Sequence, residues 1–403
     1  MKQVKWWVFG VVATFLAWRI VAVNVSQHLA AENITAASAW NKNSSQILLA
    51  QAAVTAHADA ARARAIAEDA VFYNPASGRG FLMLAGLLEL EGNVALAQNA
   101  AKMAHFLAPR DADVQLPLGA FWLRRGLPIQ ALSHWGAAVE SNPALSKTLF
   151  PVMQSIVDTP QSRLEAAKVL SNVPDWWNGF FMHVLKNTTQ EDTLKALYLA
   201  RSDKIAHDQR RAYIDHLLDV GYYTDAYFVW LNGLQSGQLA ALGNVYDGGF
   251  EQMLDDEGFG WRLSVSKGVM MAAEPTYGQG GKKALHVAFQ QKLQSRELIH
   301  QFLMLDAGKY RLSGKARLDK LDAGKGVRWE INCADRDGRQ LLSSSEYFIG
   351  TDSWNKFETG FDVPPEKCEV QMLRLQLDAG NDYDETPFSG AAWFDDLEIA
   401  RVD

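Results

Sequence analysis

The stretch FLMLAGLLELEGNVALAQNAAKMAHFLAPRD, residues 81–111, decides how the first half of the chain folds. It is rich in alanine and leucine, and it carries Gly92 near its centre and Pro109 close to its end. Glycine is favoured just past the end of a helix, and proline is favoured where a helix cannot continue. The stretch therefore predicts two helices that meet at Gly92, the second of which stops before Pro109.

The same arrangement recurs along the chain, because Pro75, Pro109 and Pro143 follow one another at intervals of 34 residues. Other small residues share this period: Ala63, Ala97 and Ala131, then Ala70, Ala104 and Ala138, and Gly92 with Gly126. Small residues allow two helix axes to approach closely, and a fixed period of this length is typical of a solenoid.

These positions resemble the tetratricopeptide repeat, in which such small residues and the closing proline take the same places. The resemblance implies an all-α solenoid, expected here over residues 26–242, whose concave side binds an extended segment of a partner protein. A degenerate copy is expected at residues 213–234, where Gly221, Ala226 and Trp230 repeat the offsets of Gly126, Ala131 and Trp135.

The N-terminus carries a segment long enough to cross a bilayer. Residues 6–25 are apolar except for Arg19 and Asn24, and twenty helical residues span about 30 Å. Lys2 and Lys5 precede the segment, which predicts a cytoplasmic N-terminus and an exported remainder. We expect residues 1–25 to form an uncleaved anchor in a bacterial-type inner membrane, with the bulk periplasmic; a cleaved secretory signal, giving a secreted protein, is the alternative.

The overall composition excludes two classes of protein. With 403 residues and 48% hydrophobic content, the chain can build two or three cores, so wholesale disorder is excluded. A net charge of −7 provides no electropositive field, so we expect no nucleic-acid partner.

After Leu242 the sequence changes to short alternating segments separated by turn residues. The segments that read as strands are KALHVAF (283–289), GKYRLSGKARL (308–318), VRWEINC (327–333), WNKFETGFDV (354–363), EVQMLRLQL (369–377) and AAWFDDLEIARV (391–402). Such a series predicts an all-β sandwich over residues 243–403.

The β half also resembles the carbohydrate-binding modules of the galactose-binding-like jelly-roll superfamily. The likeness rests on NVYDGGFEQMLDDEGFGWRL (244–263), TDSWNKFETGFDVP (351–364) and the final strand (391–402). It implies a jelly roll that binds a polysaccharide or oligosaccharide. It places Trp261, Trp354 and Trp393 in packing positions.

The same resemblance implies a structural calcium ion that ties the first strand to the last. The matching carboxylates are Glu251 with Asp395 or Asp396, and oxygen ligands of this kind suit Ca²⁺. A solvated acidic edge would explain the same residues. The loop 378–387 carries further acids without the regular spacing of a calcium loop, and a polar loop explains it as well.

Two cysteines, Cys333 and Cys368, are the only ones in the chain. In an exported domain they are expected to form a disulfide, which would contribute about 3 to 4 kcal/mol in the chain-entropy model.

Strand alternation selects the residues that could hold a sugar. Val327, Trp329, Ile331 and Cys333 share one face, taken as the core, which leaves Arg328 and Glu330 on the other. The same reasoning turns Leu373, Leu375 and Leu377 inward and Met372, Arg374 and Gln376 outward. If the two outward faces adjoin, Arg328, Glu330, Arg374 and Gln376 form a polar patch that could grip hydroxyl groups; a solvated sheet face explains the pattern equally. Tyr347 is the aromatic residue expected to stack on a sugar ring.

The sequence contains no nucleophile elbow, phosphate-binding loop or zinc motif, so we expect a non-catalytic protein. The leading hypothesis is a membrane-anchored scaffold of surface or extracellular polysaccharide biosynthesis or export, which recruits a protein through its repeats and a glycan through its jelly roll. One alternative is a pure protein–protein scaffold with a structural jelly roll. A polysaccharide-processing enzyme with a hidden carboxylate pair is another.

Overall fold

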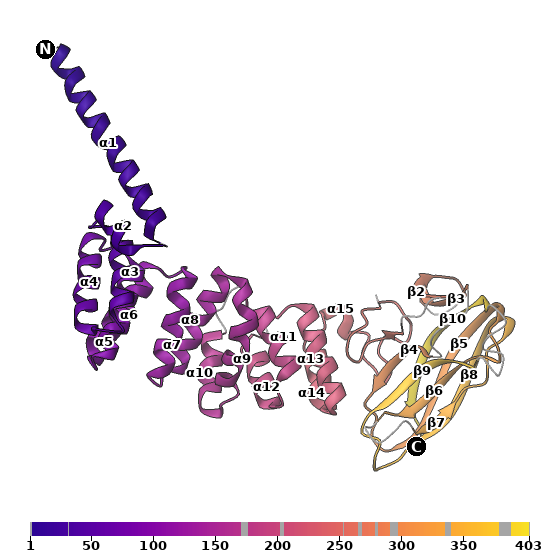
Figure 1. Ribbon diagram of the computed structural model, residues 1–403. Coiled ribbons are helices and arrows are strands. Elements are labelled where there is room, and N and C mark those ends of the chain that lie inside the picture. The colour runs from indigo at the N-terminus through magenta and orange to yellow at the C-terminus, as the bar shows by residue number, and fades with distance from the viewer. Residues whose placement is uncertain are drawn as a thin grey trace. The chain divides into compact units, whose positions relative to one another are not determined.

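A computed structural model describes residues 2–30, 32–170, 176–201, 205–252, 254–264, 268–278, 281–290, 297–334, 340–378 and 388–402 (Figure 1). Contacts within the chain divide it into two units, Met1–Ile205 and Ala206–Asp403. The first unit is helical, and the second combines a few helices with all the strands.

The first unit begins with a long apolar helix, α1 (Lys2–Ala30). Its residues from Trp6 to Ala30 are long and apolar enough to cross a membrane or to act as a signal sequence, with a mean hydropathy of 1.9. The end of the helix packs against α2 (Ile34–Trp40), because Ala22 and Ser26 are buried and the rings of Trp18 and Trp40 lie 5.6 Å apart.

Next come three antiparallel helix pairs that repeat in register. They are α3 (Ser45–Thr55) with α4 (Ala60–Tyr73), α5 (Gly78–Leu90) with α6 (Val94–Leu107), and α7 (Ala112–Arg124) with α8 (Pro128–Ser141). Helices α5 and α7 begin 34 residues apart, as do α6 and α8. The six alanines that share the period are fully buried, and Gly92 and Gly126 have φ of 75° and 70° between the paired helices. The helical repeats expected from the sequence are therefore present in this unit.

The rest of the unit continues as shorter helices. They are η1 (Pro143–Leu145), α9 (Ser146–Val157), α10 (Pro160–Leu170), α11 (Trp177–Asn187) and α12 (Glu191–Leu199). Aromatic side chains hold this part together: Phe150 and Phe180 lie 5.4 Å apart, and Phe180 also contacts Trp176 and Trp177.

The second unit starts with α13 (His207–Val220), α14 (Tyr223–Leu231) and α15 (Ser236–Leu239). The sequence predicts a domain boundary after residue 242, where its pattern changes to short alternating segments, and the contacts group these helices with the strands. Ion pairs explain this grouping. Arg210 donates two hydrogen bonds of 2.8 Å to Glu257, and Arg262 lies 2.8 Å from Asp215.

Within the described residues, ten strands form a sandwich of two antiparallel five-stranded sheets, with orders β1-β4-β9-β6-β7 and β2-β3-β10-β5-β8. Figure 1 labels all of them except β1. The first sheet comprises β1 (Arg262–Leu263), β4 (Glu297–Leu303), β6 (Gly326–Cys333), β7 (Leu341–Ser344) and β9 (Gln371–Asp378). The second comprises β2 (Val269–Pro275), β3 (Lys283–Phe289), β5 (Gly308–Asp322), β8 (Gly350–Val363) and β10 (Ser389–Arg401). The predicted β-sandwich is confirmed.

The core lies between the sheets, and it contains the inward residues that alternation predicted. Val327, Trp329 and Ile331 are fully buried, as are Leu373, Leu375 and Leu377. The predicted disulfide Cys333–Cys368 is present, with its Cα atoms 5.0 Å apart.

The three tryptophans assigned to packing do not share one environment. Trp261 is buried in the core, against Phe250 and Trp329. Trp354 and Trp393 instead lie half-buried on the outer face of the second sheet, beside Arg317. Both still pack against neighbouring side chains, as Trp393 stacks on His286 at 4.4 Å, but they do so outside the core because their strands turn them away from the facing sheet.

Candidate functional site

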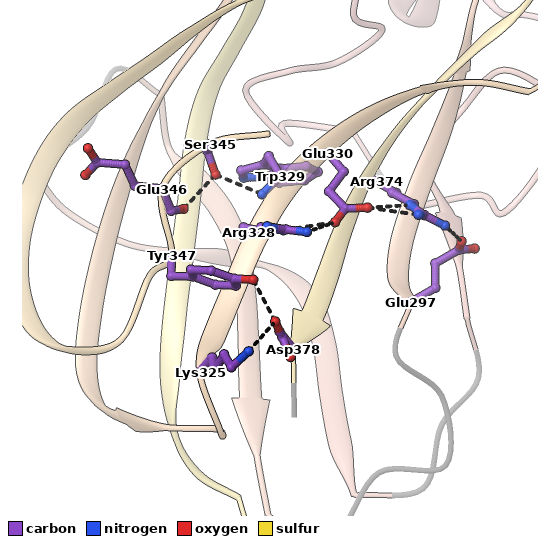
Figure 2. Close-up of polar contacts among 10 residues, drawn as sticks. All are labelled: Glu297, Lys325, Arg328, Trp329, Glu330, Ser345, Glu346, Tyr347, Arg374 and Asp378. Atoms are coloured by element: carbon purple, nitrogen blue, oxygen red, sulfur yellow. Dashed lines mark hydrogen bonds and ion pairs between the residues drawn. The ribbon is translucent and has the colours of Figure 1, made fainter. Parts of the chain in front are cut away.

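The two outward faces singled out in the sequence lie side by side in the first sheet. β6 and β9 are antiparallel neighbours, with Arg328 opposite Gln376 and Glu330 opposite Arg374. Residues directly opposite each other project from the same face of a sheet. The structure therefore brings the four residues of the polar patch together. Figure 2 shows three of them, Arg328, Glu330 and Arg374.

Glu330 is the centre of the polar patch. Arg328 donates to one of its carboxylate oxygens at 2.9 and 2.7 Å, and Arg374 donates to the other at 3.1 and 2.8 Å (Figure 2). Glu330 is only 4% exposed, so both arginines are held in fixed orientations. Because the guanidinium groups are already oriented, a ligand that accepts hydrogen bonds from their remaining N–H groups would lose little side-chain entropy on binding.

Two residues of β4 extend the polar patch, and the sequence analysis did not identify them. Glu297 accepts from Arg374 at 3.4 Å, and its other oxygen lies 2.9 Å from His300 Nδ1. They lie on β4, the segment ELIHQFL, in which polar and apolar residues do not alternate, since Gln301 is buried and Phe302 lies outward.

Tyr347 stands at the margin of the polar patch and is 37% exposed. The Arg328 guanidinium lies over its ring at 4.9 Å, and its hydroxyl donates to Asp378 at 2.6 Å (Figure 2). This hydrogen bond raises the pKa of Tyr347, with a smaller effect of burial. Ser345 fixes the segment, because its hydroxyl accepts from Trp329 N–H and donates to Glu346 O. The aromatic ring is thus positioned beside the arginine.

Gln376 differs from the rest of the polar patch. Its Oε1 atom is buried and has no hydrogen-bond partner among the residues that the structure describes. A buried acceptor without a donor carries a free-energy cost of about 1 to 3 kcal/mol.

The carboxylates expected to hold calcium lie near one another. A Cβ atom on Gly249 would be 3.7 Å from Asp395 Oδ1 and 3.9 Å from Glu251 Cγ. Asp395 is fully buried, and its Oδ2 atom has no hydrogen-bond partner within the described residues. Burial raises the pKa of Asp395 to about 7, and the charges of Asp396 and Glu251 add to this increase.

The two alternatives, Asp395 and Asp396, have different environments. Lys315 neutralises Asp396 at 2.7 Å, whereas Asp395 faces Glu251, which accepts from the backbone N–H of Lys283 at 3.0 Å. A buried carboxylate oxygen without a donor fits a divalent cation, so Asp395 with Glu251 is the better-fitting pair. In the described parts of the chain, no group of three or more His, Cys, Asp or Glu side chains converges on one point. The acids of residues 379–387 lie outside the described residues.

The helical unit contains a separate groove of about 1360 Å³ along α3, α5 and α7. Its floor is apolar and includes Leu82, Met83 and Phe121. Charged pairs lie at its margin, where Arg79 contacts Asp113 at 2.6 Å and Arg124 contacts Glu89 at 2.7 Å; Leu90, also on the groove, is 71% exposed.

Comparison with known proteins finds similarity in the β-sandwich. No protein-family model matches the chain, and no curated protein does. Among solved structures, a CBM4 module is 14% identical and has a TM-score of 0.30, covering 39% of this chain and 99% of that module. The CBM22-1 xylan-binding domain of Paenibacillus barcinonensis Xyn10C is 15% identical, with a TM-score of 0.29 and coverage of 39% and 92%.

A third solved structure, TmCBM61 in complex with β-1,4-galactotriose, is 16% identical, with a TM-score of 0.28 and coverage of 40% and 99%. Similarity at this level does not identify a ligand for this chain.

Proposed function

We propose that the chain binds a saccharide on the outer face of β4, β9 and β6 and holds a protein partner in the groove of its helical repeats. Residues 6–30 would attach it to the inner membrane, with both units on the periplasmic side. The protein would then act as a non-catalytic recruiter in polysaccharide biosynthesis or export, since joining two binding surfaces raises the local concentration of one ligand near the other.

One observation carries the saccharide proposal: Glu330 fixes Arg328 and Arg374 beside an exposed aromatic ring, Tyr347. Sugars are recognised by aromatic rings that cover their apolar faces and by fixed polar groups that pair with their hydroxyls. Both elements are present within one sheet face.

The charges of this face favour a neutral saccharide. Arg328 and Arg374 are balanced by Glu330 and Glu297, and Lys325 lies 3.7 Å from Asp378. A uronate would bring a negative charge next to carboxylates that already hold the arginines. We therefore expect neutral sugars to bind in preference to acidic ones.

An array of neutral and acidic oligosaccharides tests the proposal with the full chain in detergent. The chain should bind one or more neutral saccharides, and Arg328→Ala should lose that binding. Arg311→Ala is the matched control, because Arg311 lies on β5, is 52% exposed and contacts Glu358 only at 3.8 Å. Absence of binding to every saccharide would refute the glycan half of the proposal.

The groove of α3, α5 and α7 supports the protein-partner half. Gly86 lies on this groove within α5, and a Cβ atom there would have no atom within 4 Å. Glycine inside a helix is costly, so its presence in the groove is consistent with close approach of a bound chain. The groove combines an apolar floor with charged pairs, which suits an extended peptide with apolar side chains.

A bulky side chain in the groove tests this part. Gly86→Trp should abolish recovery of the partner when the protein is purified from its own cells after cross-linking. Ala95→Trp, at an exposed position of α6 outside the groove lining, should recover it. Equal recovery with both variants would exclude the groove as the partner site.

Two alternatives remain distinguishable by experiment. A scaffold with a structural sandwich would bind partners but no saccharide. An enzyme would release reducing ends from a polysaccharide; the saturation of both Glu330 oxygens by arginine donors argues against a proton-transfer role for that residue.

A further inference from the structure

The sheet face that carries the polar patch is bounded on two sides by helices of the same unit. A saccharide-binding face that is open on all sides can bind any internal stretch of a polysaccharide. A face that is covered on some sides restricts which part of the polysaccharide can bind. The inference below rests on the proposed saccharide binding.

The first boundary lies at the ends of β6 and β9, one step beyond the pair of Glu330 and Arg374. Asn332 and Met372 follow on the same outward face, opposite each other, yet they are only 2% and 3% exposed. Tyr223 of α14 reaches this end of the sheet, where its hydroxyl donates to Ala334 O at 3.4 Å. Outward positions that are buried in this way are covered by other parts of the chain.

Aromatic packing continues the same boundary on β4. Phe302 lies outward, opposite Met372, and its ring is 6.2 Å from that of Phe259. Phe259 in turn packs edge-on against Tyr227 of α14 at 5.1 Å and against Trp230 at 5.8 Å. Helix α14 and the segment around Phe259 therefore close this end of the face.

The second boundary lies at the β1 edge of the sheet. His300 is paired with Arg374 on one side and with Arg262 of β1 on the other. Arg262 contacts Asp215 of α13 at 2.8 Å, and Arg211 of the same helix pairs with Asp256. Arg374, His300 and Arg262 therefore lie in a row across β9, β4 and β1, and this row ends at helix α13.

Among the residues that the structure describes, nothing covers the opposite corner. Tyr347 is 37% exposed, and the side chains of Lys325 and Asp378 beside it are 65% and 30% exposed. From Arg328 to Asn332 the strand advances by about 13 Å, which leaves room for a short saccharide between the open corner and the α14 boundary.

We propose that this sheet face, bounded by α14 at one end and by α13 at one edge, binds the end of a neutral saccharide chain and excludes internal stretches. The end of the saccharide enters past Tyr347 and reaches Glu330 and Arg374. Helices α13 and α14 prevent the saccharide from extending further across the sheet. The specificity for the end of a saccharide follows because helices α13 and α14 pack against the sandwich.

The stoichiometry of binding tests the proposal. The best neutral saccharide from the array is prepared as a ladder of increasing length, up to the polymer, and titrated calorimetrically with the full chain in detergent. A face that binds only the end of a saccharide predicts one protein bound per saccharide chain at every length. Several proteins bound per chain, in a number that rises with length, would overturn the inference while leaving saccharide binding intact.

End modification gives a second readout. Reduction of the reducing end and capping of the non-reducing end are made separately on the same oligosaccharide. One of the two modifications should weaken binding at least tenfold, and the other should leave it unchanged. Binding that withstands both would overturn the inference, and an array without any bound saccharide would overturn the proposed function and the inference together.

Discussion

Glu330 and Arg374 face each other across β6 and β9, and the Arg374 guanidinium donates to one Glu330 oxygen at 3.1 and 2.8 Å while Arg328 occupies the other oxygen. A carboxylate this well buried would be costly without its partners, and with them it orients two guanidinium groups on one face. The same contact therefore stabilises the sheet and prepares the face for a polar ligand.

Arg374→Ala should lower the free energy of unfolding by about 2 to 3 kcal/mol, because Glu330 loses two of its donors while it stays buried. Arg311→Ala removes an exposed pair and should cost at most about 1 kcal/mol. Chemical denaturation of both variants measures the difference. Equal losses would show that Glu330 does not depend on Arg374.

The stability of the second unit should depend on pH and on calcium through Asp395. Burial raises the pKa of Asp395 to about 7 from an ordinary value near 4. Between these values the folded chain holds a proton that the unfolded chain releases, so in EDTA the free energy of unfolding should fall as the pH rises from about 4 to about 7. Calcium should prevent this decrease in the free energy of unfolding, since a bound Ca²⁺ ion would offset the negative charge of the Asp395 carboxylate.

Thermal unfolding from pH 4 to pH 8, with EDTA or with calcium, measures this effect. The contribution of Asp395 to the pH dependence, and the gain from calcium, should both disappear in Asp395→Asn. Asp396→Asn should retain the calcium gain, because Asp396 pairs with Lys315. A calcium gain that survives in Asp395→Asn would place the ion elsewhere.

Two helical glycines should respond to alanine in opposite directions. A Cβ atom on Gly86 would meet nothing within 4 Å, so Gly86→Ala should raise stability by about 0.5 to 1 kcal/mol. A Cβ atom on Gly119 would collide with the Trp135 indole, so Gly119→Ala should lower stability. Thermal melts of the two variants test the packing of α7 against α8. Stabilisation by both substitutions would contradict that packing.

Reduction of the disulfide should destabilise the sandwich. Cys333 and Cys368 are 35 residues apart, and a loop of that size contributes about 4 kcal/mol in the chain-entropy model. A variant with both cysteines changed to alanine should melt at a lower temperature than the oxidised chain, and dithiothreitol should not affect it further. An unchanged melting temperature would mean that the loop is restrained without the bond.

Much of the fold follows from local patterns in the sequence. The 34-residue period identified the helix pairs because each small residue in register occupies a close helix contact, as at Ala97 and Ala131. Alternation along residues 327–333 separated core from surface because side chains in a strand point to opposite faces. The disulfide could be predicted because the chain has only two cysteines, Cys333 and Cys368.

The candidate site could be predicted only in part. Strand alternation selected Arg328, Glu330 and Arg374, but it could not say that β4 is the next strand, so Glu297 and His300 were missed. Pairing between strands distant in sequence depends on tertiary packing. The contacts of α13 and α14 with the rest of the second unit also join residues distant in sequence, as Arg210 and Glu257 do.

The most direct test of the central claim is a calorimetric titration of four forms of the full chain with the best neutral saccharide from the array. The forms are the unchanged chain, Arg328→Ala, Tyr347→Ala and Tyr277→Ala. Tyr277 is the matched control, because its side chain is 92% exposed and lies between β2 and β3 in the other sheet. We predict that Arg328→Ala and Tyr347→Ala weaken binding at least tenfold, which is about 1.4 kcal/mol, and that Tyr277→Ala does not. Equal affinity in all four forms would contradict the assignment of this face as the saccharide site.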